Sequence, residues 1–250
     1  MKLKFSLAFF ISVLLMSGCV PHQSNPYASA YSGAGFYSGA TKDVFYYADY
    51  DISLTKVDTL KKSSKQSITG KLKFDDPKIS ITRLPNPKQF VFVLENKLNH
   101  SIKILWDETV FVDENGGNHK IMHSGIKLTD RGNSQPPTVI IKGGKLEDLI
   151  YPIDYISWRE GHYSKYSSSA GEWDEKPILP HAYSTIQAVD GVMLDPMIYG
   201  GKNAQQGFIE RANSYTGKIL KISLSLEDNG TKNEYLFTFK VNKVAIRHDV

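Results

Sequence analysis

Two histidines lie four positions apart in the segment His119-Lys-Ile-Met-His123. On a helix this spacing would place both imidazoles on one face, where they could bind a metal ion together. Residues 113–117, Asp-Glu-Asn-Gly-Gly, are typical of a hairpin turn, so we expect an extended strand instead. In a strand the two rings lie about 13 Å apart, at about 3.3 Å per residue. Zinc ligands must lie within about 2.3 Å of one ion, so we predict no metal site here.

Four carboxylates flank a short apolar segment nearby: Asp107, Glu108, Asp113 and Glu114. Paired carboxylates can hydrolyse glycosides, and oxygen-rich loops can bind calcium. The twelve-residue calcium-loop spacing is absent, and acids at strand ends and turns are ordinarily solvated. The chain also lacks the serine-hydrolase elbow, a dinucleotide-binding glycine motif after a strand and a phosphate-binding loop. We therefore predict no catalytic residue and no cofactor, although catalytic groups can also converge only in the folded chain.

Cys19 is the only cysteine, so no intramolecular disulfide can form. Lys2 and Lys4 precede an apolar run from Phe5 to Met16 that ends three residues before this cysteine. About a dozen apolar residues is the length of the hydrophobic region of a signal peptide, whereas a transmembrane helix needs about 20. We predict that residues 1–18 are a signal peptide.

The sequence Met16-Ser17-Gly18-Cys19 resembles the lipobox of bacterial lipoprotein precursors, which has small residues at the two positions before the cysteine. That family prefers leucine where this chain has Met16. The resemblance implies cleavage between Gly18 and Cys19, attachment of a diacylglyceryl group to the Cys19 thiol, and acylation of the new amino terminus, typically with palmitate. Several acyl chains anchor a protein stably, whereas one does not. An ordinary secretory signal with an incidental cysteine is the alternative.

Aspartate directly after the modified cysteine resembles an inner-membrane retention signal in Gram-negative lipoproteins, and this chain has Val20 there. The resemblance therefore implies a location at the outer membrane of the cell envelope. Residues 19–42 are rich in Ser, Gly, Ala and Pro and predict a flexible tether with a reach of about 25 Å. Removal of Lys2 and Lys4 lowers the formal charge from +4 to +4 − 2 = +2, so we expect no nucleic-acid partner.

Alternation of apolar and polar residues with period two dominates the rest of the chain and predicts half-buried strands. We expect strands at residues 79–82, 89–96, 102–106, 109–113, 119–123, 138–142, 146–151, 218–227 and 234–244. Asp228-Asn229-Gly230 is the clearest hairpin turn, and a weak helical period covers only Ser184–Met193. This pattern favours a mainly β fold, an antiparallel immunoglobulin-like β-sandwich over residues 43–250, with a jelly roll as the alternative.

Residues 155–216 interrupt the strand pattern and predict one long, irregular, aromatic-rich insertion in the domain. A loop of that length is uncommon in a compact domain unless it is functional or contains short elements. Its aromatic residues are our candidate binding surface for a carbohydrate or a protein: Trp158, Tyr163, Tyr166, Trp173 and Tyr183. The alternative is that they cover the open edge of the sandwich.

The chain as a whole resembles envelope lipoproteins that carry a β-sandwich domain. Its predicted function is that of a membrane-anchored binding or scaffolding module without catalysis, whose partners are the membrane and an envelope protein or glycan. The alternative is a surface-associated hydrolase or glycan-processing enzyme that uses Asp, Glu and His side chains beside the aromatic insertion.

Overall fold

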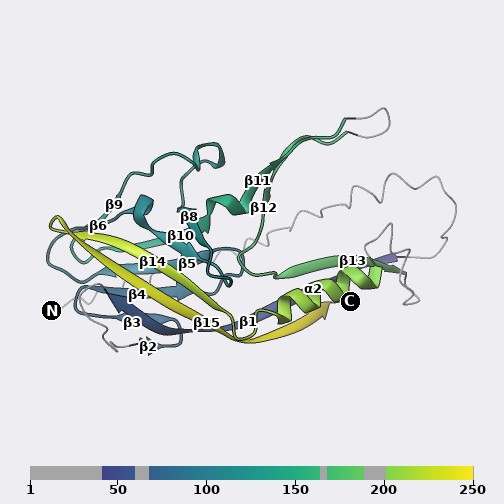
Figure 1. The fold of residues 1–250 in the computed structure, drawn as a ribbon, viewed down its shortest axis with the longest axis horizontal. Coiled ribbons are helices and arrows are strands. Elements are labelled where there is room, and N and C mark those ends of the chain that lie inside the picture. Colours follow the sequence, from purple (N-terminus) through teal and green to yellow (C-terminus); the bar gives the residue numbers. More distant parts are fainter. Residues whose placement is uncertain (1–40, 60–67, 164–167, 189–200, 250) are drawn as a thin grey trace, which may run out of the picture. The chain divides into compact units, whose positions relative to one another are not determined.

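The fold is built on two 19-residue strands, β1 (Thr41–Thr59) and β15 (Thr231–Asp249), which pair with each other in antiparallel orientation (Figure 1). The structure is a computed structural model that describes residues 41–59, 68–163, 168–188 and 201–249. These residues belong to one compact unit, Gly39–Val250. The predicted signal peptide, all of the tether before residue 41, and Tyr166 lie outside the described residues.

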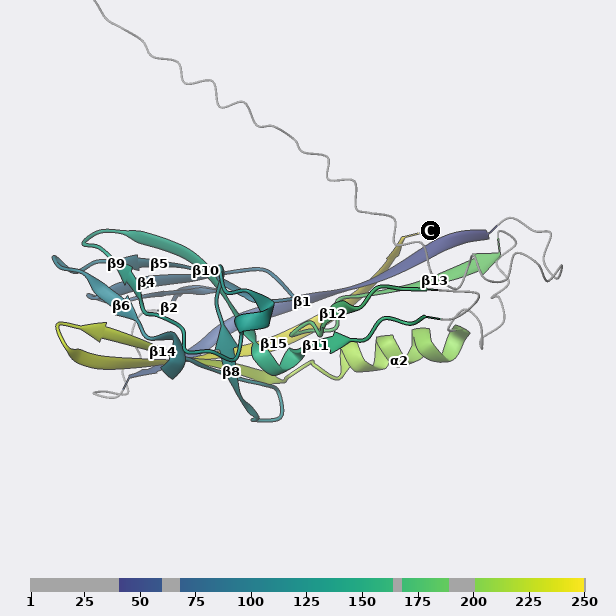
Figure 2. The same ribbon diagram turned by 90° about the horizontal axis from the view of Figure 1, so that it is seen from above.

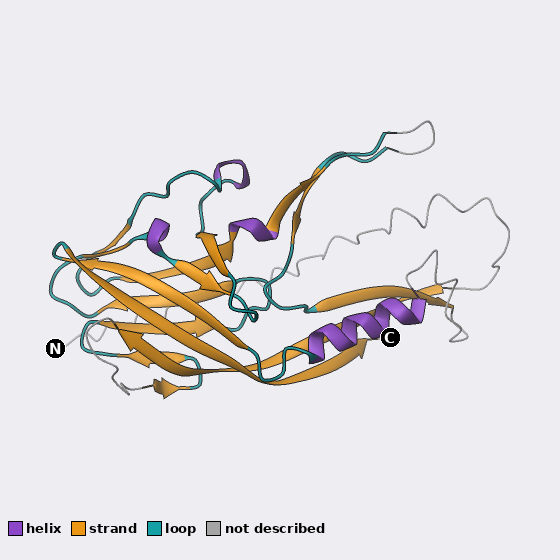
Figure 3. Cartoon of the chain, in the orientation of Figure 1, coloured by secondary structure: helices purple, strands orange, loops and turns teal. Residues whose placement is uncertain are grey.

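Within the described ranges, thirteen strands form one sheet in which every pairing is antiparallel (Figure 3). The spatial order is β13-β1-β15-β14-β7-β8-β10-β5-β4-β3-β2, and β6 and β9 branch from β14. The remaining strands are β2 (Ile68–Gly70), β3 (Lys73–Asp75), β4 (Ile79–Leu84), β5 (Phe90–Asn96), β6 (Ile102–Ile104), β7 (Val110–Val112), β8 (Asn118–Met122), β9 (Thr138–Ile140), β10 (Lys145–Pro152), β13 (Ala182–Ala188) and β14 (Ile219–Asp228).

The sheet curls until its far strands return to β1. The Leu54 N–H, in the second half of β1, donates a 2.8 Å hydrogen bond to the carbonyl of Lys71, in the turn between β2 and β3. The inward-facing residues of the curled sheet form the main hydrophobic core. Strand β5 shows the pattern most clearly, because Phe90, Phe92 and Leu94 are buried while the residues between them are partly exposed.

The predicted hairpin between β14 and β15 is confirmed. Leu220, Ile222 and Leu224 lie opposite Phe239, Phe237 and Tyr235 in the register, and all six are buried in the main core. The turn between the strands has positive φ at Asn229 (49°) and at Gly230 (74°). Two consecutive positive φ angles are what a two-residue hairpin turn that matches the strand twist requires, and Asn-Gly is the sequence that adopts them most readily.

A second, smaller core lies where β13, the first half of β1 and the end of β15 meet helix α2 (Gly201–Asn213). Phe208 and Ala212, one helical turn apart, are buried against Tyr46 and Ala48 of β1. Tyr183 of β13 stacks on Phe208, with ring centroids 5.9 Å apart. Figure 2 shows α2 alongside this part of the sheet, which we call the helix-backed extension.

Two predictions about residues 155–216 are wrong. The segment is not irregular, because it contains β11, β12, β13 and α2. Of the weak helix predicted at Ser184–Met193, residues 184–188 belong to strand β13, which pairs with β1, and residues 189–193 lie outside the described residues; a helix, α2, is described at Gly201–Asn213. The sequence of α2 contains two glycines and few apolar residues, so burial of Phe208 and Ala212 rather than intrinsic propensity stabilises it.

The chain is mainly β and its sheet is antiparallel, as predicted, but the strands form one continuous curled sheet. The separate two-stranded hairpin, β11 (Ile156–Arg159) with β12 (Glu172–Glu175), lies outside that sheet. Among the residues described, no helix is both long and apolar enough to cross a membrane.

Replacement of Phe208 by alanine tests the contribution of the extension core. Phe208 is 2% exposed, so Phe208→Ala should lower the free energy of unfolding by about 3 kcal/mol, through lost burial and the cavity left behind. The matched control is Glu210→Ala, an exposed position on the same helix, which should change it by less than about 0.5 kcal/mol. Urea unfolding followed by circular dichroism measures both, and equal effects would contradict the packing described here.

Candidate functional site

The hairpin of β11 and β12 is our candidate site, because it presents two exposed aromatic residues, Trp158 in β11 and Tyr163 just beyond it (Figure 1). Trp158 lies directly opposite Trp173 in the register, and their ring centroids are 5.2 Å apart with the rings tilted by 66°. A cross-strand pair in this edge-to-face arrangement stabilises a hairpin that would be marginal by itself. The tryptophan pair therefore holds the two strands of the site together.

The chain packs closely around Trp158. A Cβ atom added at Gly171 would lie 2.3 Å from an atom of the Trp158 ring, so only glycine allows this approach. The Trp158 residue is still 45% exposed, and Tyr163, beyond the end of β11, is 90% exposed. The hairpin thus presents an indole and a phenol ring to the surroundings of the protein.

A small buried cluster anchors the base of the hairpin, formed by Met122, Tyr151, Tyr155 and Ile156. The Tyr151 hydroxyl donates a 2.6 Å hydrogen bond to the carbonyl of Lys176, and the Lys176 N–H donates to the carbonyl of Tyr155. The Lys176 ammonium lies 4.2 Å from the centroid of the Tyr155 ring. Burial raises the pKa of both phenols, so they stay protonated at neutral pH, as the bond donated by Tyr151 requires.

Beside this base, an imidazole is held between two carboxylates. His119 Nδ1 lies 2.7 Å from Asp154 Oδ2, and His119 Nε2 lies 3.2 Å from Asp113 Oδ2. Burial acts to lower the pKa of His119, but the hydrogen bonds and charges of Asp154 and Asp113 outweigh it, and the pKa lies above its ordinary value. The cluster connects the β7–β8 hairpin to residues 153–155, which lead into β11.

A polar pocket of about 280 Å³ lies next to the anchoring cluster. It is lined by Trp106, Asp107, Thr109, Lys120, Ile121, Arg131, Gly132, Asn133, Ser134, Gln135 and Ile153. Asp107 accepts hydrogen bonds from the Ser134 hydroxyl and from the Gln135 N–H, at 3.0 Å for the latter. These bonds lower the pKa of Asp107 and keep it ionised. The cationic groups of the pocket belong to Lys120 and Arg131.

Arg131 joins this pocket to the hairpin. Its guanidinium carbon lies 4.6 Å from the centroid of the Trp173 ring, and one of its nitrogens donates a 2.8 Å hydrogen bond to the carbonyl of Leu128. A guanidinium over an indole is the most favourable cation–π geometry. The aromatic hairpin and the polar pocket therefore form one candidate binding site.

The strand predicted at residues 119–123 is confirmed as β8 (Asn118–Met122). The two histidines of the predicted segment, His119 and His123, take different partners. His123 stacks on Trp106 with ring centroids 4.2 Å apart, and its Nδ1 lies 3.3 Å from Asp148 Oδ2. Burial acts to raise the pKa of Asp148. The hydrogen bonds that its carboxylate accepts from His123 and from the N–H groups of Ser124 and Leu149 outweigh burial, so the pKa lies below its ordinary value. His123 therefore belongs to the packing around Trp106 rather than to the His119 cluster.

The four carboxylates singled out from the sequence do not converge. Asp107 faces Ser134 and Gln135, Glu108 pairs with Lys232, Asp113 pairs with His119, and Glu114 accepts from Asn115. In the parts of the chain that the structure describes, no group of three or more His, Cys, Asp or Glu side chains is arranged to hold a metal ion.

The structure brings together three of the predicted binding residues, Trp158, Tyr163 and Trp173, on one hairpin. Tyr183 lies elsewhere, because it packs on Tyr46 and Phe208 in the helix-backed extension. Tyr166, like Gly18 and Cys19, lies outside the described residues.

Sequence reasoning missed Arg131 and the pocket. The available signal was the turn-rich segment Thr129-Asp-Arg-Gly-Asn-Ser134 between two predicted strands, a composition typical of an exposed loop.

No family model matches the chain, and no curated protein matches it. Among solved structures, the chain is similar to the crystal structure of the yjhA protein from Bacillus subtilis, with 15% sequence identity, 68% of this chain and 86% of that chain covered, and a TM-score of 0.21. A TM-score this low does not show that the two proteins share a fold.

The His119 cluster makes stability depend on pH. Because its pKa is raised in the folded state, His119 stabilises the fold fully below its unfolded pKa of about 6.5, and this contribution is lost as pH rises through the folded value. Urea unfolding of His119→Gln should therefore show a larger loss of stability at about pH 6 than at about pH 9. His162→Gln, at an exposed position, should cost less than about 0.5 kcal/mol. A loss for His119→Gln that grows with pH would contradict this assignment.

Proposed function

We propose that this chain is a membrane-anchored envelope lipoprotein that binds another envelope component through the aromatic hairpin and the adjoining pocket, without catalysis. The observation that supports the binding role best is the exposure of Trp158 and Tyr163 on a hairpin outside the main core. Aromatic rings on a rigid support give large contact area at low entropic cost. The neighbouring pocket supplies charged and hydrogen-bonding groups that can orient a partner.

The proposed anchor rests on the lipobox-like sequence that ends at Cys19. Strand β1 begins at Thr41, so about twenty residues separate the proposed lipid from the first strand, with a reach of about 25 Å. The residue after the cysteine, Val20, supports the outer membrane as the location. An envelope protein and a glycan are both partners of suitable chemistry, because aromatic faces pack equally on apolar side chains and on the C–H faces of sugar rings.

One observation favours a second candidate, a hydrolase. Asp113, His119 and Asp154 converge within hydrogen-bond distance beside the hairpin base. Both nitrogens of His119 face carboxylates and its pKa is raised, which favours the doubly protonated imidazolium, a poor general base. No described serine, threonine or cysteine side chain bonds to this ring. We therefore assign the cluster a positioning role at the hairpin base.

For the fold, we keep the immunoglobulin-like sandwich as a proposal. The inward faces of a curled antiparallel sheet can enclose a core as two packed layers do. An experimental structure in which the main sheet divides into two layers with Greek-key connections would support it, and a fully closed barrel would refute it.

The anchor is tested by Cys19→Ala. Without the thiol no diacylglyceryl group can attach, so incorporation of radiolabelled palmitate should disappear and the protein should move from the membrane to the soluble fraction. Cys19→Ser is the matched control, because it also lacks a thiol and should behave identically. Palmitate labelling that persists in either variant would refute the lipoprotein assignment.

The binding surface is tested by Tyr163→Ala, which removes a 90% exposed ring and leaves the tryptophan pair intact. Photo-crosslinking in the native envelope followed by mass spectrometry should show the partner's yield falling by about tenfold, the loss expected for an aromatic hot spot. The matched control removes exposed apolar side chains elsewhere, Val139→Ala with Ile141→Ala, and should leave the yield unchanged. Equal crosslinking in wild type and Tyr163→Ala would refute the proposed surface.

A further inference from the structure

Hydrogen bonds within the protein hold the walls of the polar pocket beside the hairpin in place. The buried Gln135 side chain donates through Nε2 to the carbonyl of Ile121 and accepts through Oε1 from the N–H of His123. It therefore fixes the loop that forms one wall to the β8 segment that forms another. Asp107 holds the same loop, because it accepts from the Ser134 hydroxyl and from the Gln135 N–H. The pocket is thus formed before any partner binds.

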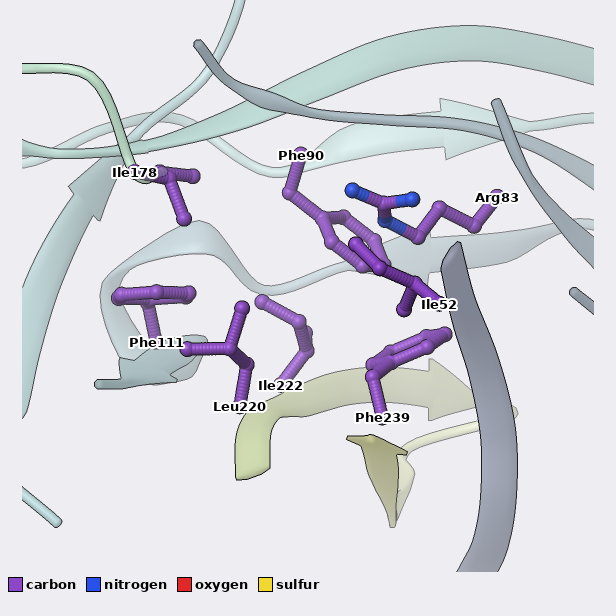
Figure 4. Close-up of a pocket in the computed structure, with 8 residues that line it drawn as sticks. All are labelled: Ile52, Arg83, Phe90, Phe111, Ile178, Leu220, Ile222 and Phe239. Carbon is purple, nitrogen blue, oxygen red and sulfur yellow. The ribbon is translucent and has the colours of Figure 1, made fainter. Parts of the chain in front are cut away.

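The volume of this pocket, about 280 Å³, gives room for an amino-acid side chain. A cavity inside the main core, beside Arg83, differs in this respect (Figure 4). Its volume is about 10 Å³, the lower limit for one water molecule, and its other lining side chains are apolar. Of these two cavities, only the pocket beside the hairpin can admit part of a partner.

The free hydrogen-bond donors of the pocket belong mainly to two cations, Lys120 and Arg131. A guanidinium has five N–H donors, and the carbonyl of Leu128 uses one of those of Arg131. Among the described residues, no carboxylate forms an ion pair with either cation. The buried polar groups of the lining are already hydrogen-bonded, and the exposed amide of Asn133 offers both donors and an acceptor. A partner group that satisfies the pocket must therefore bring mainly acceptors.

The charge of the lining favours an anion as the source of those acceptors. Lys120 and Arg131 contribute two positive charges and Asp107 one negative charge, so the formal charge of the lining is +2 − 1 = +1. A monoanion such as a carboxylate neutralises this charge. The guanidinium of Arg131 is held over the ring of Trp173, so it loses little freedom when it binds, and its planar fork matches a carboxylate.

The hairpin beside the pocket suits a polypeptide better than a sugar chain. Stacking on a sugar requires a whole open ring face, and part of each indole is already covered. Arg131 lies over Trp173, the two indoles contact each other, and the backbone at Gly171 packs against the six-membered ring of Trp158. Strands β11 and β12 form a sheet of only two strands, so each has one edge without a strand partner. The main chain of a polypeptide can pair with the N–H and C=O groups of such an edge.

We propose that this pocket binds the carboxylate side chain of an aspartate or glutamate in the protein that the hairpin contacts. This inference rests on the binding function proposed above and adds the chemistry of the partner to it. Arg131 connects the two parts of the site, because it lines the pocket and also lies over Trp173. The acidic side chain enters the pocket while neighbouring residues of the same partner contact the hairpin.

The test titrates the purified full chain with blocked pentapeptides of four alanines around a central glutamate or glutamine, and with sodium glucuronate. Tryptophan fluorescence reports binding, because Trp106 lines the pocket and Trp173 lies under Arg131. The glutamate peptide should bind about tenfold more tightly than the glutamine peptide, since only it offers a charged acceptor. Glucuronate should bind more weakly than the glutamate peptide, because it has no main chain to pair with the hairpin.

Two variants test the cations one at a time. Lys120→Gln and Arg131→Gln should each raise the Kd of the glutamate peptide by about tenfold, the effect of one lost charge-assisted hydrogen bond. Lys120→Gln leaves the contact between Arg131 and Trp173 in place, so it separates the loss of charge from any disturbance of the hairpin. The matched control is Lys240→Gln, which removes the same charge from an exposed position on β15, a strand that contributes no residue to the pocket.

Three results would overturn the proposal: equal Kd values for the two peptides, a Kd for the glutamate peptide that neither pocket variant changes, or glucuronate bound as tightly as the glutamate peptide. The proposed binding function is tested separately by crosslinking of Tyr163→Ala. If the glutamate peptide does not bind while Tyr163→Ala still lowers the crosslinking yield, only the assignment of the pocket is refuted. If crosslinking is unchanged as well, the binding function is refuted with it.

Discussion

The antiparallel ladder between β1 and β15 is the interaction on which the rest of the described structure depends. It runs from the pair Phe45–Asp249 to the pair Thr59–Tyr235 and passes through both hydrophobic cores. Register shifts at Asp51/Ile52 and at Leu54/Lys56 mark where β1 passes from the helix-backed extension into the curled sheet. Such bulges bend a strand and change which of its residues face inward. One pair of strands can therefore contribute side chains to both hydrophobic cores.

Period-two alternation was sufficient to predict the mainly β character, the extended β8 and the β14–β15 hairpin, because the pattern and the turn residues that define them are local. Closure of the sheet was not predictable, since it depends on a contact between Leu54 and Lys71 across a segment with no distinctive pattern. Helix α2 was missed for a related reason. Among the residues of α2 whose burial the structure describes, only Phe208 and Ala212 are buried. The residues that pack on them come from β1, more than 150 positions earlier, and from β13.

The candidate site, too, could be predicted from the sequence only in part. The aromatic residues of the hairpin were conspicuous in the sequence, and the pairing of Trp158 with Trp173 follows from strand register once the hairpin exists. Tyr183 was indistinguishable from them by residue type, yet it belongs to the packing of the extension. Arg131 was not found because a cation becomes notable only through what surrounds it. It lies over the indole of Trp173, more than 40 positions later, and that environment is not encoded nearby in the sequence.

The position of β1 between two antiparallel partners has a mechanical consequence. A pull transmitted from the residues before Thr41 enters β1 at its first residue and acts along the strand axis. The ladder to β13 covers Thr41–Tyr47 and the ladder to β15 runs from Phe45 onward, so β1 is paired along its whole first half, and the hydrogen bonds are perpendicular to the strand. Such a force loads many bonds at once in shear instead of opening them one by one. The chain therefore enters the described part of its fold at a point suited to bearing tension.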